Sequence, residues 1–165
     1  MKFTDAYEEH FWSVYGFHGY RLRSKGETED LTQETFERAL KAWHRFDPDR
    51  GELRPWLLRI ARNTYIDYRR RQGSRPRIAA DSLDEMGDPP ELPTGAEIAL
   101  DPALAKALSQ LSTREREAIA LRFGGDLRTA DVAQVLGVST ANAQQILSRA
   151  LRRLRSILEP EQRPE

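Results

Sequence analysis

The sequence contains no cysteine, which excludes a disulfide framework and any metal site built on thiolates. It also has no apolar run long enough to cross a membrane, and its first residues, MKFTDAYEEHFW, lack the basic and then apolar segments of a secretory signal. We therefore expect a cytoplasmic protein without membrane insertion. With 39% hydrophobic residues, 32% charged residues and a mean hydropathy of −0.69, the 165 residues predict one soluble domain or two small ones, mainly helical.

The signatures of the common enzyme classes are absent as well. His10, His18 and His44 have no second histidine four residues further on and no matching carboxylates, so they predict no metal site. The sequence has no G-x-x-x-x-G-K-[ST] phosphate loop and no local nucleophile motif. We expect a protein that is not an enzyme, with no catalytic residue, no metal and no cofactor.

The formal net charge is +0, but the charges are unevenly distributed along the chain. Residues 1–71 carry 14 basic and 12 acidic residues, residues 72–101 carry 2 and 7, and residues 102–165 carry 10 and 7. Two mildly basic blocks thus flank an acidic connector that is rich in proline and glycine. We interpret residues 72–100 as a flexible linker between two domains, in which Leu83 and Met86 allow a brief contact.

The first block ends in PWLLRIARNTYIDYRRR, residues 55–71, where arginines and aromatic residues alternate at helical spacing. One side of this helix is apolar and is expected to face a core: Leu57, Ile60, Ala61, Thr64 and Tyr68. Another side is basic and polar: Trp56, Arg59, Asn63 and Arg70. Such a side suits phosphates and unstacked bases. A solvated basic face with Trp56 packed into the core explains this stretch equally well.

Two helices are expected before the basic one. The first runs from Thr4 to about Leu22 and is ended by Lys25 and Gly26. Thr28 precedes the second, EDLTQETFERALKAWHRF, and FDPDRGELR at residues 46–54 forms a short loop. One side of the second helix is polar: Asp30, Gln33, Glu34, Glu37 and Lys41. Taken alone, this side is best interpreted as solvated surface.

Helix-start and helix-stop signals divide the C-terminal block. Asp101 and Pro102 begin one helix, and the capping box from Ser112 to Glu115 begins another, which Gly124 and Gly125 end. A short helix over residues 128–136, a turn at Gly137 and a longer helix over residues 140–158 follow. The last two helices are expected to share a core: Ala133, Leu136, Val138, Ala143, Leu147, Ala150, Leu154 and Leu158.

Two helical segments joined by a glycine turn, the second rich in arginine, are typical of a helix-turn-helix. The side of the second segment opposite its apolar face is polar: Asn142, Gln145, Arg149 and Arg152. Asparagine and glutamine pair well with adenine edges, and arginine pairs with guanine or phosphate. A plain helical bundle with a polar face is the alternative, and the pattern favours DNA binding over it.

Four segments in this order, EDLTQETFERALKAWHRFDP, RPWLLRIARNTYIDYRRR, LSTREREAIALRF and DVAQVLGVSTANAQQILSRALRRLR, resemble the second and fourth conserved regions of bacterial RNA polymerase sigma factors. The resemblance is to the extracytoplasmic-function (ECF) group of the sigma-70 family. It implies an all-α fold of two small helical domains: a region 2-like domain over residues 1–71 and a region 4-like helix-turn-helix domain over residues 101–165. The flexible acidic linker, residues 72–100, joins them.

The resemblance further implies a transcription initiation factor that directs core RNA polymerase to promoters, with an anti-sigma factor as a further partner. Polymerase contacts through the β′ clamp helices are implied for Asp30, Gln33, Glu34 and Glu37, and the β flap is a second implied contact. Contacts to the minus-ten element, with a base pocket in residues 46–54, are implied for Phe46, Arg54, Trp56, Arg59, Arg62, Asn63 and Arg70. Contacts to the minus-thirty-five element are implied for Ser139, Thr140, Asn142, Gln145, Arg149 and Arg152.

One segment departs from the family pattern. Where the family commonly has a basic V-K-S-R run early in the recognition helix, this chain has Ala143, Gln144, Gln145 and Ile146. Loss of two cations flattens the salt dependence of duplex binding and costs about tenfold or more in affinity. We therefore hypothesise weak or unusual minus-thirty-five recognition. Ile146 has an alternative role on a surface that holds an inhibitor or an adjacent helix.

Two other classes of protein compete with this interpretation. One is a stand-alone helix-turn-helix regulator that acts without core polymerase, although such proteins usually bind as symmetric dimers and no dimer seam is evident. The other is a helical adaptor without DNA contact, which the arginines of residues 55–71 argue against.

Overall fold

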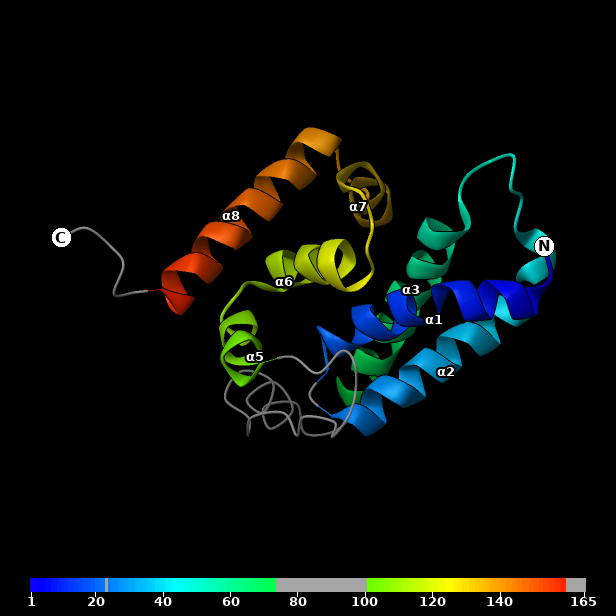
Figure 1. The fold of residues 1–165 in the computed structure, drawn as a ribbon, viewed down its shortest axis with the longest axis horizontal. Coiled ribbons are helices and arrows are strands. Elements are labelled where there is room, and N and C mark those ends of the chain that lie inside the picture. The colour runs from blue at the N-terminus through cyan, green and yellow to red at the C-terminus, as the bar shows by residue number, and fades with distance from the viewer. Residues whose placement is uncertain (23, 74–100, 160–165) are drawn as a thin grey trace.

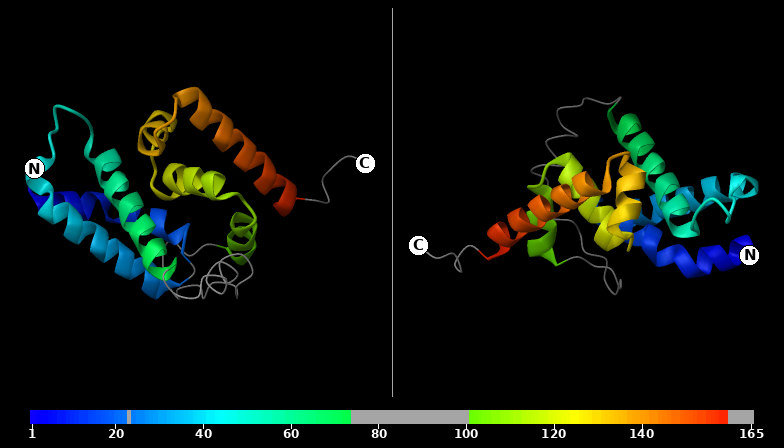
Figure 2. Two further views of the ribbon diagram at one scale, coloured as in Figure 1. Left: turned by 180° about the vertical axis from the view of Figure 1, so that it is seen from behind. Right: turned by 90° about the horizontal axis from the view of Figure 1, so that it is seen from above.

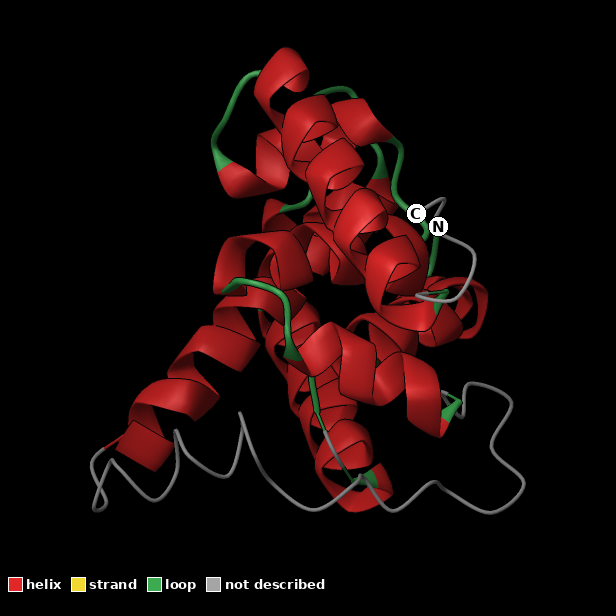
Figure 3. Ribbon diagram, turned by 90° about the vertical axis from the view of Figure 1, so that its left-hand side faces the viewer, coloured by secondary structure: helices red, strands yellow, loops and turns green. Residues whose placement is uncertain are grey.

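The computed structural model describes residues 1–22, 24–73 and 101–159. Throughout these ranges the ordered elements are helices joined by turns and loops, and none of the described residues lies in a strand (Figure 3). The predicted all-α fold class is therefore confirmed. The linker prediction, including the contact of Leu83 and Met86, lies outside the described residues.

The N-terminal helices form one compact group. It comprises α1 (Phe3–Gly19), α2 (Lys25–Lys41), the short 3-10 helix η1 (Trp43–Arg45) and α3 (Leu53–Gly73), and the three long helices pack against one another (Figure 1). Val14, Phe17, Leu57 and Leu58 on α1 and α3 are fully buried. Burial of each such apolar side chain stabilises the fold by roughly 1.5–3 kcal/mol. Isolated helices of this length are only marginally stable in water, so packing and not helix propensity holds this group together.

The boundary between α1 and α2 differs from the prediction. Gly26 does not end the first helix but lies exposed in the first turn of the second, which Ser24 caps by accepting a hydrogen bond from the Glu27 backbone nitrogen at 3.1 Å. The Ser24 hydroxyl in turn donates to the Glu27 carboxylate at 3.1 Å. This local cap outweighs the low helix propensity of Gly26, because a capping side chain satisfies an otherwise orphaned backbone donor.

The C-terminal helices follow their start and stop signals closely. They are α5 (Pro102–Ser109), α6 (Thr113–Ile119), the π turn η2 (Ala120–Gly124), α7 (Thr129–Leu136) and α8 (Thr140–Leu158). The Asp101 carboxylate caps α5 at 2.7 Å from the Ala103 nitrogen, and the predicted Ser112 and Glu115 capping box is present. Gly137 adopts a φ of 72° at the end of α7, a left-handed conformation that favours glycine.

The predicted core of α7 and α8 is largely confirmed. Ala143, Leu147, Ala150 and Leu154 are all buried between α8 and the helices α6 and α7. Leu158 was predicted to join them, and this is wrong: its side chain is 43% exposed. It lies in the last turn of α8, one helical turn beyond Leu154, where the packing against the other helices ends.

The two groups of helices also pack against each other. Helix α1 contacts η2, and α3 contacts α7, so α6 and α7 lie between α8 and the N-terminal helices (Figures 1 and 2). Gly16 of α1 and Gly124 of η2 meet backbone to backbone, and a Cβ atom on Gly16 would overlap the carbonyl oxygen of Gly124. The apolar core is continuous through this contact. Glycine at both positions is therefore a condition of the observed packing.

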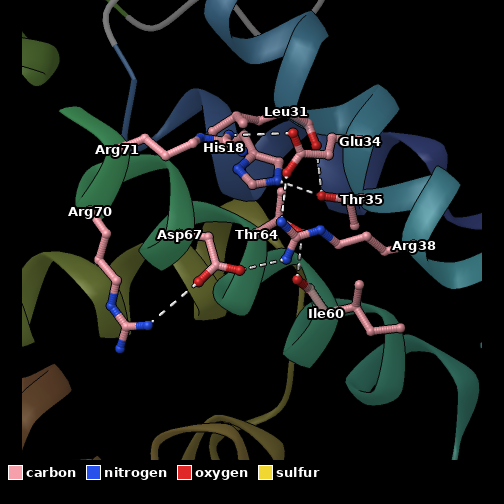
Figure 4. Close-up of polar contacts among 10 residues, drawn as sticks. All are labelled: His18, Leu31, Glu34, Thr35, Arg38, Ile60, Thr64, Asp67, Arg70 and Arg71. Atoms are coloured by element: carbon pink, nitrogen blue, oxygen red, sulfur yellow. Dashed lines mark hydrogen bonds and ion pairs between the residues drawn. The ribbon is translucent and has the colours of Figure 1, made fainter. Parts of the chain in front are cut away.

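His18 is a buried polar residue at the centre of the N-terminal group. Its Nε2 lies 2.9 Å from the Thr35 hydroxyl, which itself donates to the Leu31 carbonyl oxygen at 2.6 Å (Figure 4). Because the Thr35 proton is used in that second bond, its oxygen accepts from His18, and the ring carries its proton on Nε2. Burial, assisted by the nearby Arg21, lowers the pKa of His18 to about 3.

This burial predicts a loss of stability in mild acid. The folded protein holds His18 neutral down to a pKa of about 3, whereas the unfolded chain binds a proton below its ordinary pKa of 6.5, so protonation favours unfolding between these values. We expect the unfolding free energy to fall by about 2 kcal/mol between about pH 7 and about pH 5 from this group alone. Urea denaturation of the wild type and of His18→Gln measures the difference, with the exposed His44→Gln as control. A pH dependence that His18→Gln leaves unchanged would contradict the assignment.

Candidate nucleic-acid interface

The polar side of α2 has the exposure that a binding surface requires. Asp30, Gln33 and Glu37 are exposed to solvent. Glu34 differs, because it is half-buried and held by Arg38 of the same helix at 2.9 Å and by Arg71 of α3 at 3.3 Å (Figure 4). The first three side chains are free to meet a partner, whereas Glu34 also ties α2 to α3.

Arg38 extends this connection between the two helices. Its guanidinium donates to the Asp67 carboxylate of α3 at 2.8 Å, while Arg70 approaches the other oxygen of Asp67 at 3.7 Å (Figure 4). The hydrogen bond from Arg38, with the positive charges of Arg70 and Arg71, lowers the pKa of Asp67. The within-helix pair of Glu34 and Arg38 was readable from its four-residue spacing. The pairing across helices was not, because it depends on how α2 and α3 cross.

Helix α3 presents a basic face as predicted. Arg59, Asn63 and Arg70 are exposed. On the expected core side Leu57, Ala61 and Thr64 are fully buried, while Ile60 and Tyr68 are half-buried. Leu58 and Tyr65 are also buried, at 0% and 6% exposure, and the sequence pattern did not place them in the core. Helix α3 therefore buries more than one stripe, because α1, α2 and α7 all pack against it.

Trp56 and Phe46 belong to an aromatic cluster between the loop and α3. The ring centroids of Phe46 and Trp56 are 5.2 Å apart, those of Trp43 and Phe46 are 5.7 Å apart, and those of Trp43 and Trp56 are 6.1 Å apart. All three side chains are half-buried. Packing thus accounts for part of each ring, and the rest remains accessible.

Residues 46–54, which comprise the loop before α3 and the first two residues of that helix, border a hollow with a volume of about 1040 Å³. Its walls come from the loop itself, from α1 and from the segment between η2 and α7. Its lining includes His10, Phe46, Arg54, Asp126 and Arg128. A base pocket in this loop was expected, but part of its lining comes from the C-terminal group.

Two of the cations expected to contact DNA are engaged by acids of the C-terminal group. The Arg54 guanidinium lies 3.0 Å from the Asp126 carboxylate and 3.3 Å from its backbone oxygen. Arg62 lies 3.2 Å from the carboxylate of Glu117 on α6. Arg128 makes a further ion pair with Glu52 of the loop at 3.4 Å. The structure therefore leaves Arg59 and Arg70 more accessible than Arg54 and Arg62.

Arg54 also contacts His10 on α1. Its Nε donates to His10 Nδ1 at 3.4 Å, which places the ring proton on Nε2. Burial lowers the pKa of His10, Glu9 opposes this, and the positive charge of Arg54 adds to the lowering. His10 is therefore a neutral acceptor that orients an arginine.

The polar face of α8 is exposed along its length. Ser139, Thr140, Asn142, Gln145, Arg149 and Arg152 are all exposed, and the Ser139 hydroxyl additionally caps the helix at 3.0 Å from the Asn142 nitrogen. Arg153 anchors the helix to α6 through the Glu115 carboxylate at 2.8 Å. Burial alone would raise the pKa of Glu115, but hydrogen bonds from Ser112 and the charge of Arg153 lower it overall.

Ile146 does not form part of an exposed surface. Its side chain is 8% exposed and packs in the core, as does Ala143. The suggestion that Ile146 holds an inhibitor is therefore wrong, whereas contact with adjacent helices is what the structure contains. The reason is helical geometry: Ile146 shares the buried side of α8 with Ala143 and Ala150.

In residues 1–22, 24–73 and 101–159, no cluster of three or more histidines and carboxylates could hold a metal ion. No helix in that part of the chain combines the length and the hydrophobicity needed to cross a bilayer.

An exposed acidic side on α2, a basic side on α3 and a helix-turn-helix in α7 and α8 are the surfaces expected of an RNA polymerase sigma factor. Family models agree: sigma-70 region 2 matches residues 6–75, and sigma-70 region 4 matches residues 107–156. The chain belongs to the sigma-70 family, in its ECF group. Sigma factors bind core RNA polymerase and direct it to promoters, so the predicted function and these two partners are confirmed.

Individual relatives support this membership. The ECF RNA polymerase sigma factor SigM of Bacillus subtilis is 29% identical over 157 residues, which cover 95% of each chain. SigX of the same organism is 32% identical over 165 residues, covering 95% of this chain and 84% of SigX. The sigma factor RpoE of Bartonella quintana, solved in complex with the anti-sigma factor NepR, matches with a TM-score of 0.76 at 26% identity, over 95% of this chain and 96% of that one.

The packing of Trp56 predicts a structural cost when its ring is removed. We expect Trp56→Ala to lower the unfolding free energy by about 2 kcal/mol, because the half-buried ring loses its contacts with Trp43 and Phe46. Arg59→Ala, on the exposed side of the same helix, should change it by less than about 0.5 kcal/mol. Urea denaturation measures both. Equal costs for the two variants would contradict a packing role for Trp56.

Proposed function

We propose that the surfaces described above divide promoter recognition among three faces of this sigma factor. Asp30, Gln33, Glu34 and Glu37 on α2 contact the β′ clamp helices of core polymerase. Residues of α3 and the preceding loop contact the minus-ten element, and α8 contacts the minus-thirty-five element. The observation that carries the proposal is the unpaired polar side of α2, because Asp30, Gln33 and Glu37 are exposed while the neighbouring Glu34 is paired.

The polymerase-binding face is supported by its chemistry. Carboxylates and an amide on one side of a helix match an arginine-rich partner surface through charge-assisted hydrogen bonds. Glu34 contributes less directly, because Arg38 and Arg71 already engage it. The β flap is the second polymerase contact, on the C-terminal group.

The minus-ten contacts combine backbone and base recognition. Arg59, Asn63 and Arg70 lie on the exposed side of α3, and Arg54 and Arg62 join them once their acidic partners are replaced. Phe46 and Trp56 offer partly exposed rings on which an unstacked base can stack. The hollow at residues 46–54 is the pocket for a base that has left the duplex.

The minus-thirty-five contacts come from α8. Ser139, Thr140 and Asn142 lie at its start, where recognition helices approach base edges. Gln145 follows one turn later, and Arg149 and Arg152 are placed for phosphates. The cations of this helix therefore lie in its second half.

Residues 1–71 and 101–165 act as two domains, joined by residues 72–100 as a flexible linker. The protein works in the cytoplasm and carries no catalytic residue of its own, since RNA synthesis belongs to the polymerase. An anti-sigma factor is a further partner, which the match to RpoE in complex with NepR supports.

The polymerase face is tested by co-elution with bacterial core RNA polymerase on a sizing column. We expect the wild-type chain to co-elute and the double variant Asp30→Ala, Gln33→Ala to dissociate, because two of the three exposed polar groups of the α2 face are lost. Glu34 is left intact, since its removal would also break the ion pairs to Arg38 and Arg71.

The matched control changes one acid and one glutamine elsewhere, Glu8→Ala with Gln134→Ala, both exposed and outside α2. It should co-elute as the wild type does. A wild-type chain that fails to bind core polymerase but shifts duplex DNA alone would favour the stand-alone regulator instead.

The role of α8 is tested by the salt dependence of holoenzyme binding to a promoter duplex selected from a random library. Arg149→Ala should make the slope of log K against log salt shallower by about 0.9, because one phosphate contact is lost. Arg114→Ala, an exposed arginine on α6, is the control and should leave the slope unchanged. If both variants give the wild-type slope, Arg149 does not contact phosphate.

A further inference from the structure

Arg21 and Arg62 converge on one carboxylate. Arg21 Nη1 lies 3.4 Å from Oε2 of Glu117, and Arg62 Nε lies 3.2 Å from Oε1. Arg21 and Glu117 are almost completely buried, at 6% and 7% exposure. The two arginines belong to the N-terminal group of helices, and the carboxylate belongs to α6 of the C-terminal group.

The arginine side of this contact is held in place by its own group. The Arg21 guanidinium lies 4.1 Å from the ring centroid of Tyr65 on α3, and its buried Nε has no hydrogen-bond partner. Arg62 lies one turn before Tyr65 on the same helix and shares its basic side with Arg59. Removal of Glu117 would thus leave two oriented cations with a free donor, which is the arrangement that binds an anion.

A carboxylate and a DNA phosphate present similar groups to these arginines. Both carry negative charge on oxygen acceptors that a guanidinium fork can bind. Two neighbouring guanidinium groups repel each other when no anion lies between them. A phosphate therefore binds more favourably once the Glu117 carboxylate has left. Because Arg62 and Arg59 lie on the same helix, a strand bound along α3 would bring a phosphate to this position.

A second acid makes the same kind of contact nearby. Asp126 engages Arg54, which lines the hollow at the loop over residues 46–54. Glu117 and Asp126 thus occupy two separate cations of the proposed minus-ten surface in the packed arrangement. At the same interface Gly16 and Gly124 meet backbone to backbone.

We propose that Arg21 and Arg62 form an anion site for a DNA backbone phosphate, and that Glu117 fills this site when α5–α8 pack against α1–α3. DNA and the C-terminal group then compete for the same guanidinium groups, so the packed form masks part of the strand-binding surface. Arg21 is an added member of that surface. The identity of the anion as DNA rests on the proposed function, whereas the site itself rests on the geometry.

The first test compares binding of a fluorescein-labelled single strand of mixed sequence to full-length variants at low salt, by fluorescence anisotropy. Glu117→Gln should raise the affinity about three- to tenfold and steepen the salt slope by about 0.7, because one more phosphate is contacted. Adding Arg21→Gln to Glu117→Gln should remove the gain. Glu8→Gln, an exposed acid of α1, makes the same change in net charge and should leave the affinity near the wild-type value.

The second test opens the interface without touching a charge. Gly16→Ala places a methyl group against the Gly124 carbonyl, whereas Gly26→Ala, also in a helix, meets no atom within 4 Å. Alanine favours a helix over glycine, so neither change should unfold its own helix. Small-angle X-ray scattering should show a larger radius of gyration for Gly16→Ala only, with a rise in single-strand affinity that Arg21→Gln removes.

The outcomes separate this inference from the proposed function. If Glu117→Gln and Gly16→Ala bind the single strand no better than their controls, or if all variants fail to bind, the anion site is refuted. If Glu117→Gln raised the affinity for a duplex of the same sequence by the same factor, the assignment of the anion site to single-stranded DNA would be refuted. Failure of the wild-type chain to co-elute with core polymerase would instead refute the proposed function, and a gain with Glu117→Gln would still establish the anion site.

Discussion

The ion pairs of Glu117 with Arg21 and Arg62 constrain how the two helical groups can pack against each other. A buried carboxylate is stable only where cations or donors replace its lost hydration, and here both cations come from the other group. Gly16 and Gly124 allow the backbones of α1 and η2 to approach closely enough for these charges to meet. The position of α6 therefore decides whether both arginines have their carboxylate partner, which couples α6 to the availability of the basic helix.

Much of the fold could be predicted because its signals are local. Asp101 and Ser112 begin helices through hydrogen bonds to residues two or three positions away, so the sequence alone contains both partners. Gly26 was misassigned because its low helix propensity was weighed without the cap at Ser24. Leu158 was misassigned for a different reason: helical periodicity predicts which side of α8 is apolar, but not where the neighbouring helices end.

In the candidate site, the exposed faces of the helices could be predicted from the sequence, but the ion pairs between distant segments could not. The exposed side of α8 and the basic side of α3 follow from the spacing of polar residues along each helix. The partners of Arg54 and Arg62 do not, because Asp126 and Glu117 approach them only through the packing of distant segments. Trp56 lies between these cases. Its spacing placed it with the cations, and its contacts with Phe46 and Trp43 give it a share in packing.

The burial of Ile146 changes the meaning of the missing basic run on α8. Two cations were counted as lost from the DNA-binding side, at Gln144 and at Ile146, yet only Gln144 is exposed while Ile146 packs in the core. An arginine in the position of Ile146 would have to leave the core to reach a phosphate in this geometry. The expected loss is therefore one phosphate contact, which flattens the salt slope by about 0.9 and not by twice that amount. The neutral side chains at the start of α8 then contact bases, and Arg149 and Arg152 further along bind phosphates. Base recognition and phosphate binding are therefore separated along one helix.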